Sequence, residues 1–141
     1  MFRFRAWYDG KNGKEMLYEN RTGDCFRWLD EGQPITIMQF IGLKDENGKE
    51  IYEGDVIEEL RDIMSKGLKL FTQVEYRGLV AFEKDRFIIT KLYHNSIKQN
   101  GLIQKWVRCS YDIYFSDITY KYEVIGNVYE NPELLKEDNN G

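Results

Sequence analysis

The sequence predicts a mainly β protein of a single domain, in which one strongly curved sheet forms a partial barrel and a short helical turn follows. Apolar and polar residues alternate along most of the chain, which is the pattern of strands. Aromatic residues make up 15% of the 141 residues, and they pack well on pleated sheet faces. The only two prolines, at positions 34 and 132, leave most of the backbone free to pair. We expect residues 1–135 to form the domain and residues 136–141 to form a frayed tail.

The centre of the chain, residues 41–57, is predicted to form a hairpin. Asn47 and Gly48 lie between two apolar runs, and this dipeptide is a strong hairpin signal because both central turn residues take positive φ. A second turn is expected at Gly54-Asp55, with the aspartate side chain accepting hydrogen bonds from nearby backbone amides. Gly42, Gly54 and Gly126 are interpreted as sharp corners of the curved sheet.

The N-terminal third is predicted to begin with a strand, because Phe2, Phe4 and Ala6 alternate with Arg3, Arg5 and Trp7. The glycine-rich stretch 9–13 turns this strand back onto residues 15–18. The next expected elements are a polar turn over 20–24, a short strand over 25–29, a turn over 30–34 and a strand over 35–41.

The C-terminal half is predicted to contain more strands and one ambiguous segment. Leu60, Ile63 and Met64 fall at helical spacing, so residues 59–66 are expected to form either a helical turn or a mobile loop. Asn131 is expected to cap a helix of one or two turns that starts at Pro132. The other expected elements are strands over 70–76 and 79–83, a hairpin tip at 84–85, a return strand over 86–92, a loop over 93–101, and strands over 102–109, 113–115 and 121–129.

Charge and cysteine content exclude several classes of protein. The formal net charge is −4 and the basic residues alternate with acidic ones, so no basic stripe for nucleic acid is visible and we expect weak binding or none. Cys25 and Cys109 are isolated, which suggests a reducing compartment. The sequence has no signal peptide and no apolar run of about 20 residues, so we expect a cytoplasmic protein without a membrane span.

No group of residues predicts a cofactor, a metal site or a catalytic site. His94 is the only histidine, which excludes a two-histidine zinc site, and we interpret it as an exposed loop residue. Paired carboxylates can perform acid–base chemistry or hold a cation, but turn formation explains Asp55 better. The acidic cluster consists of Glu53, Asp55, Glu58, Glu59 and Asp62. The aromatic residues, Trp7, Trp28 and Trp106 among them, fit sheet packing better than a stacking platform for single-stranded nucleic acid, and exposed tyrosines would mark a protein interface.

Three segments carry a resemblance to a known family: GLKDENGKEIYEGDVI over 42–57, YEVIGNVYENPELL over 122–135, and the opening strand Phe4–Trp7. With these segments the chain resembles the YopX family of phage and prophage proteins. The resemblance implies a small, mostly β protein with a sheet curled into a partial barrel. It implies no activity, because the family has no established biochemical function or catalytic residues. The residues that we expect to form the structural motif are Trp7, Gly42, Asn47, Gly48, Tyr52, Gly54, Asp55, Gly126, Asn127, Pro132 and Leu134.

These observations favour a phage- or prophage-derived accessory protein that is not an enzyme and that binds a protein or has a structural role. Its partner would be an unidentified host or phage protein, or a second copy in a homo-oligomer. The alternatives are a nucleic-acid-associated small β-barrel and, third, a small enzyme that uses the carboxylates of residues 53–62. We also expect Leu134 or Leu135 to pack back on the barrel or on a neighbouring subunit.

Overall fold

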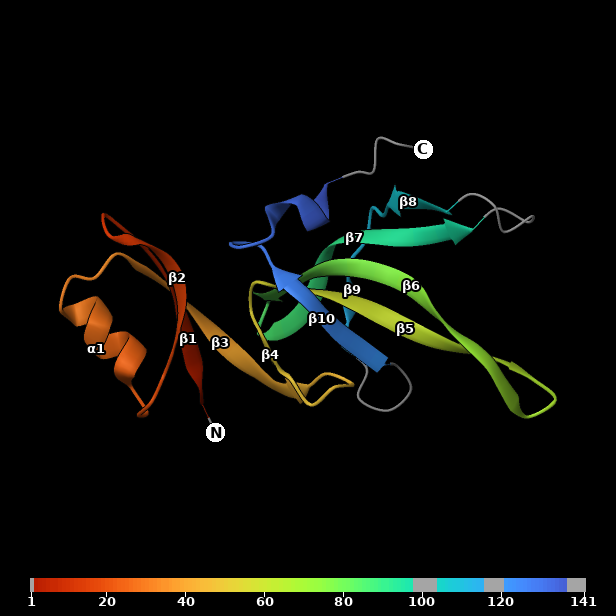
Figure 1. Cartoon of the computed structure of the whole chain (residues 1–141), viewed down its shortest axis with the longest axis horizontal. Coiled ribbons are helices and arrows are strands. Elements are labelled where there is room, and N and C mark those ends of the chain that lie inside the picture. The colour runs from red at the N-terminus through yellow and green to blue at the C-terminus, as the bar shows by residue number, and fades with distance from the viewer. Residues whose placement is uncertain (1, 98–103, 116–120, 137–141) are drawn as a thin grey trace.

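The structure is a computed structural model that describes residues 2–97, 104–115 and 121–136. The chain is mainly β and forms a single domain, as the sequence predicts (Figure 1). Two sheets build it, with strand orders β2-β1-β3-β4 and β10-β5-β6-β7-β8, and β9 pairs with β7. The elements are β1 (Phe4–Gly10), β2 (Gly13–Tyr18), α1 (Asp24–Asp30), β3 (Ile35–Lys44), β4 (Glu50–Tyr52), β5 (Asp55–Ser65), β6 (Leu68–Glu83), β7 (Arg86–Ile97), β8 (Gln104–Arg108), β9 (Ile113–Tyr114), β10 (Lys121–Asn127) and the 3₁₀ helix η1 (Pro132–Leu135).

The N-terminal sheet curls strongly into a half-barrel, which confirms the predicted partial barrel. β1 lies between β2 and β3, and both neighbours are antiparallel to it. The pairing of β3 with β4 shifts register between Phe40 and Lys44, where Gly42 has φ +91°. This positive φ agrees with the predicted corner, since glycine adopts it without strain.

The C-terminal sheet holds the main apolar core. β5, β6 and β7 follow one another as antiparallel neighbours, and β10 returns to pair with the other edge of β5. The fully buried core side chains are Ile51, Ile57, Val80, Ile89, Leu92 and Tyr122. Because Ile51 belongs to β4, the short strand at the end of the N-terminal sheet contributes to the same core.

The central hairpin forms where it is predicted, but with a different turn. Gly48 has φ +83°, whereas Asn47 does not take a positive φ, so the expectation that both turn residues would do so is wrong. The Gly48 amide donates to the carbonyl of Asp45 at 3.0 Å, which makes Gly48 the fourth residue of the turn. Of the two residues, only position 48 therefore has the positive φ that favours glycine.

The short strand expected over residues 25–29 is wrong, because these residues form α1. Gly23 precedes the helix with φ +91°, and Asp24 Oδ2 accepts hydrogen bonds from the amides of Asn20 and Arg21, both at 2.9 Å. Phe26 then packs edge-on against Phe4 of β1. The local hydrogen bonds of Asp24 to the preceding loop and one tertiary contact thus override the strand preference of an aromatic run.

Both expectations for residues 59–66 are wrong, because β5 continues to Ser65 and turns at Lys66-Gly67 into β6. The register of β5 against β6 shifts between Glu59 and Leu60, and again between Ile63 and Met64. Each irregularity interrupts strict alternation. The apparent helical spacing of the apolar residues therefore comes from bulges in a strand.

The second hairpin of this sheet has its tip at Lys84-Asp85, as predicted. The predicted break at Arg77-Gly78 is instead a register shift within a continuous β6. The loop expected from Tyr93 is wrong up to Ile97, since β7 runs to that residue and carries His94. Three parts of the expectations lie outside the described residues: the end of that loop over 98–101, residues 102–103 of the next strand, and the tail over 137–141.

The C-terminal segment folds back on the domain, as predicted. η1 begins at Pro132, but Asn131 makes no side-chain cap and instead bonds back to β10. The side chains of Leu134 and Leu135 are half-buried. Tyr93 Oη donates to the carbonyl of Leu135 at 2.8 Å, which ties η1 to β7.

Candidate functional site

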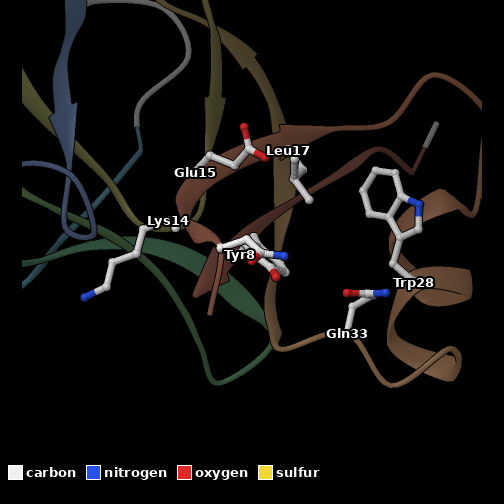
Figure 2. Close-up of a pocket in the computed structure, with 8 residues that line it drawn as sticks. Tyr8, Lys14, Glu15, Leu17, Trp28 and Gln33 are labelled. Atoms are coloured by element: carbon white, nitrogen blue, oxygen red, sulfur yellow. The ribbon is translucent and has the colours of Figure 1, made fainter. Parts of the chain in front are cut away.

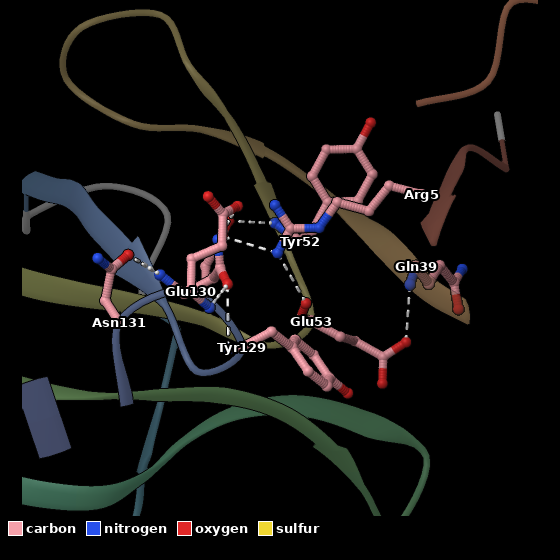
Figure 3. A network of polar contacts seen from close by, with 9 residues as sticks. Arg5, Gln39, Tyr52, Glu53, Tyr129, Glu130 and Asn131 are labelled. Carbon is pink, nitrogen blue, oxygen red and sulfur yellow. Dashed lines mark hydrogen bonds and ion pairs between the residues drawn. The ribbon is translucent and has the colours of Figure 1, made fainter. Parts of the chain in front are cut away.

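A buried ion pair joins the two sheets. Arg5 of β1 and Asp55 at the start of β5 are 2% and 1% exposed, and Arg5 Nη2 lies 2.8 Å from Asp55 Oδ1 (Figure 3). The guanidinium also donates to the carbonyl of Glu53 at 3.2 Å and lies over the ring of Tyr52, 4.7 Å from its centre. The second carboxylate oxygen accepts from the Tyr52 amide at 2.8 Å, which confirms the predicted turn role of Asp55.

The electrostatics of this pair fit a structural role. Burial raises the pKa of Asp55, while the nearby Arg5 charge and the Tyr52 amide act in the opposite direction. Removing either partner would leave the other charge buried without compensation, which is costly. Both oxygens of Asp55 are already engaged, so neither is free to act as a base toward a substrate.

The turn after β10 closes the same junction. The Asn127 side-chain oxygen accepts hydrogen bonds from the amides of Tyr129 and Glu130 at 3.1 and 2.8 Å, and its amide group donates to Glu130 Oε1. The ring of Tyr129 stacks on Trp7 of β1, with centroids 5.6 Å apart. This turn therefore fixes an aromatic contact between the last strand and the first.

Two glycines permit close approach at this junction. A Cβ atom at Gly54 would lie 2.9 Å from Met38 Sδ and 3.3 Å from Tyr129 Cε2. A Cβ atom at Gly126 would lie 2.5 Å from Asn131 Oδ1 and 2.8 Å from a methyl carbon of Leu134. Real Cβ atoms do not tolerate the shorter of these distances, so a side chain at either position would force the neighbouring side chains to shift.

The central hairpin docks against β10 through one carboxylate. Asp45 Oδ1 accepts from the amides of Asn47 and Lys49 at 2.9 and 2.8 Å, while Oδ2 accepts from the Val124 amide at 3.0 Å. The Glu46 amide adds a hydrogen bond to the carbonyl of Tyr122 at 2.9 Å. The turn thus provides a second contact between the two sheets.

We call the junction around Arg5 and Asp55 the seam. The structure brings most of the predicted motif residues to it: Trp7, Tyr52, Gly54, Asp55, Gly126, Asn127 and, through η1, Leu134. Pro132 is the exposed first residue of η1. Asn47 and Gly48 lie at the separate contact between the hairpin and β10. Gly42 is away from both contacts, and a Cβ atom at this position would have no neighbour within 4 Å. Sequence reasoning missed Arg5 as the partner of Asp55, because an arginine in an alternating strand reads as solvent-facing.

The acidic residues of 53–62 do not converge on one site. Glu58 is held by Arg77 at 2.7 Å, and Asp62 is bound by Thr72 and Lys121. Glu59 is buried near Glu75 but forms no hydrogen bond to another described residue through its side chain, and burial raises its pKa. Among the described residues, no group of three histidine, cysteine or acidic side chains is arranged to hold a metal ion.

His94 lies in β7, where its side chain contacts other residues, and not in the expected loop. It packs against the ring of Tyr76 and lies 3.3 Å from Glu75 Oε1. The expected loop is therefore wrong, because His94 belongs to β7, although its side chain is still 39% exposed. Cys25 of α1 is fully buried, and burial together with Glu19 raises its pKa to about 12. A thiol with such a pKa stays protonated at neutral pH and is a poor nucleophile.

An open groove lies between α1 and the β1–β2 hairpin, and we call it the α1 groove (Figure 2). Its volume is about 580 Å³, within the range of about 300–1,000 Å³ that is typical of ligand sites. The indole of Trp28 and the side chains of Leu17 and Tyr8 provide apolar surface. The remaining lining residues are Asn12, Gly13, Lys14, Glu15 and Gln33. Sequence reasoning considered Trp28 only as a packing or stacking residue.

Comparisons with known proteins identify a family but no activity. None of the helices in the described parts of the chain has the length and apolar character that a membrane crossing needs. No curated protein matches the sequence. The crystal structure of protein EF1440 from Enterococcus faecalis is similar, with 24% sequence identity and a TM-score of 0.44, and the match covers 96% of this chain and 99% of that chain. The sequence model described as "YopX protein" matches residues 3–136, nearly the whole chain, and the protein therefore belongs to the YopX family.

Proposed function

We propose that the protein is a phage- or prophage-derived accessory protein that acts in the host cytoplasm by binding another protein and catalyses no reaction. The observation that carries the proposal is the α1 groove, in which Trp28 and Leu17 leave apolar surface open beside polar side chains. Tyrosine and tryptophan are enriched in protein interfaces, where they act as anchors. The partner is a host or phage protein, or a second copy of the chain.

The distribution of charge supports binding over catalysis. The carboxylates of Asp55 and Glu58, which a hydrolytic or metal-dependent mechanism would need, are engaged by arginine side chains. The net charge of −4 weighs against the alternative role with nucleic acid, since phosphate backbones are bound by neutralising cations.

The test is affinity capture from host cells with the tagged protein, followed by mass spectrometry and by sequencing of bound nucleic acid. Trp28→Ala and Leu17→Glu should each lose a protein that the wild type retains. Phe82→Ala is the matched control, because Phe82 is about half exposed on β6, outside the groove, and should retain that protein. Capture that is identical with all four baits would contradict the proposal, and recovery of nucleic acid that persists at about 150 mM salt would favour the alternative.

A further inference from the structure

One hairpin of the C-terminal sheet extends beyond its neighbouring strands. The described pairing of β10 with β5 ends at Leu60, and the described pairing of β7 with β6 ends at Tyr76. Residues 61–72, which we call the arm, therefore continue as a two-stranded ribbon. Figure 1 places the tip of the arm and α1 at opposite ends of the long axis of the molecule.

The arm carries apolar side chains in solvent. Leu68 and Leu70 are 71% and 61% exposed, and Met64 and Phe71 are 55% and 52% exposed. An isolated two-stranded hairpin is marginally stable in water, and grouped apolar side chains of this kind mark interaction sites. The arm thus needs a covering surface that the described part of the same chain does not provide.

Charge indicates what covers the arm. Arg61, Lys66 and Lys69 against Asp62 give the arm a formal charge of +2, whereas the whole chain carries −4. The residues that line the α1 groove include one basic and one acidic side chain, Lys14 and Glu15, which cancel. The segment on its α1 side, residues 24–33, has three acidic side chains and one basic side chain, a formal charge of −2. Two arms would repel one another, while the basic arm and the acidic α1 side of the groove attract, and the apolar side chains of the arm can meet Trp28 and Leu17.

We propose that the α1 groove takes the arm of a second copy of this chain, with Leu68 or Leu70 placed against Trp28 and Leu17. The proposal rests on the proposed function, because it names the occupant of the same groove. The contact joins two different surfaces, so it is heterologous and repeats head to tail into a closed ring or an open filament. Each copy would offer one arm and one groove.

The test is sedimentation equilibrium of the full chain over a series of concentrations. The wild type should exceed the monomer mass of 16.9 kDa, and its average mass should rise with concentration. The arm variant Leu68→Ser/Leu70→Ser and the groove variant Glu15→Lys should each sediment close to the monomer mass. The substitutions in both variants lie at exposed positions, so the variants should fold. Trp28→Ala tests the contribution of the indole that lines the groove and should also reduce the average mass. Phe82→Ser is the control and should behave as the wild type does.

Mixing the arm variant with the groove variant decides the geometry. One intact arm and one intact groove then remain, so the mixture should form a dimer of twice the monomer mass and grow no further. A groove variant that still self-associates would show arm-to-arm contact and overturn the proposal, as would a mixture that stays monomeric.

A wild type that is monomeric at every concentration would also overturn this inference. If affinity capture still depends on Trp28 in that case, protein binding by the groove stands and only the occupant is wrong. If capture is also unchanged by Trp28→Ala, both proposals fail.

Discussion

The seam and the α1 groove share one strand, yet they differ in almost every physical property. Arg5 and Trp7 project from β1 toward the junction of the two sheets, where they meet Asp55 and Tyr129. Phe4 and Tyr8 belong to the opposite face, toward α1 and the groove. The seam is built on a buried ion pair, whereas the groove is open and is lined by both apolar and polar side chains. The two faces of one alternating strand thus carry the residues that join the sheets and the residues that face α1 and the groove.

The largest test of this comparison is the removal of one seam charge. Asp55→Ala leaves Arg5 buried without its partner, so the free energy of unfolding should fall by about 3–5 kcal/mol in urea titrations. The double variant Arg5→Met/Asp55→Leu should recover much of that loss, since apolar side chains need no compensation. A loss within about 0.5 kcal/mol for Asp55→Ala, as at ordinary surface positions, would show that the pair is not the basis of the seam.

The second test concerns the segment that covers the seam from the C-terminal side. Leu134 is half-buried, so Leu134→Ala should cost roughly 1–2 kcal/mol, less than the range of 2–5 kcal/mol for fully buried leucines. Truncation after Asn131 should cost more, because it also removes the acceptor of the Tyr93 hydroxyl. Removal of residues 137–141 serves as the control and should leave the melting temperature unchanged. If the protein truncated after Asn131 melted at the same temperature as the wild type, η1 would make no contribution to stability.

The third test addresses the hairpin contact beside the seam. Gly48→Val forces a β-branched residue to φ +83°, which should lower stability by about 1–3 kcal/mol. Gly48→Asn should cost much less, because asparagine tolerates positive φ. The measurement is urea titration of the wild type and the two variants. Equal stability of all three would show that the turn does not require a positive φ at position 48.

The smallest test uses Glu59, a buried acid that contrasts with the paired Asp55. Burial raises the pKa of Glu59 above 4.5, so the ionised carboxylate is less favourable in the folded state than in the unfolded one. This penalty is absent below the unfolded pKa and develops as pH rises through the folded pKa. Glu59→Gln should therefore stabilise the protein at pH 7 relative to wild type and lose this advantage below pH 4.5. A difference that does not change with pH would assign the effect to packing.

Local chemistry made parts of this fold predictable. The Gly48 and Gly54 turns and the hairpin tip at Lys84-Asp85 follow from residues that are close in sequence. The turn role of Asp55 was also predictable, because its carboxylate bonds the Tyr52 amide three residues away. These predictions required no knowledge of distant partners.

The errors arise where distant partners decide the structure. Residues 25–29 form a helix whose Phe26 packs against Phe4, and residues 59–65 form a strand whose bulges depend on pairing with β6. β7 extends past His94 because it pairs with β8 as far as Ile97, and the buried Asn95 side chain also donates to the carbonyl of Val74. The α1 groove could not be predicted, since Trp28 and Leu17 meet only after α1 has packed beside the hairpin.

The hydrogen bond from Val124 to Asp45 spans 79 residues, and this has a consequence for the order in which the chain matures on the ribosome. The hairpin that contains Asp45 emerges early, with one carboxylate oxygen and one edge of β5 still lacking their partners. Contacts of such long sequence separation form slowly, and unpaired strand edges promote aggregation while they persist. β10 is synthesised after all the other described strands, and its arrival completes the docking of the hairpin and covers the edge of β5 in one step.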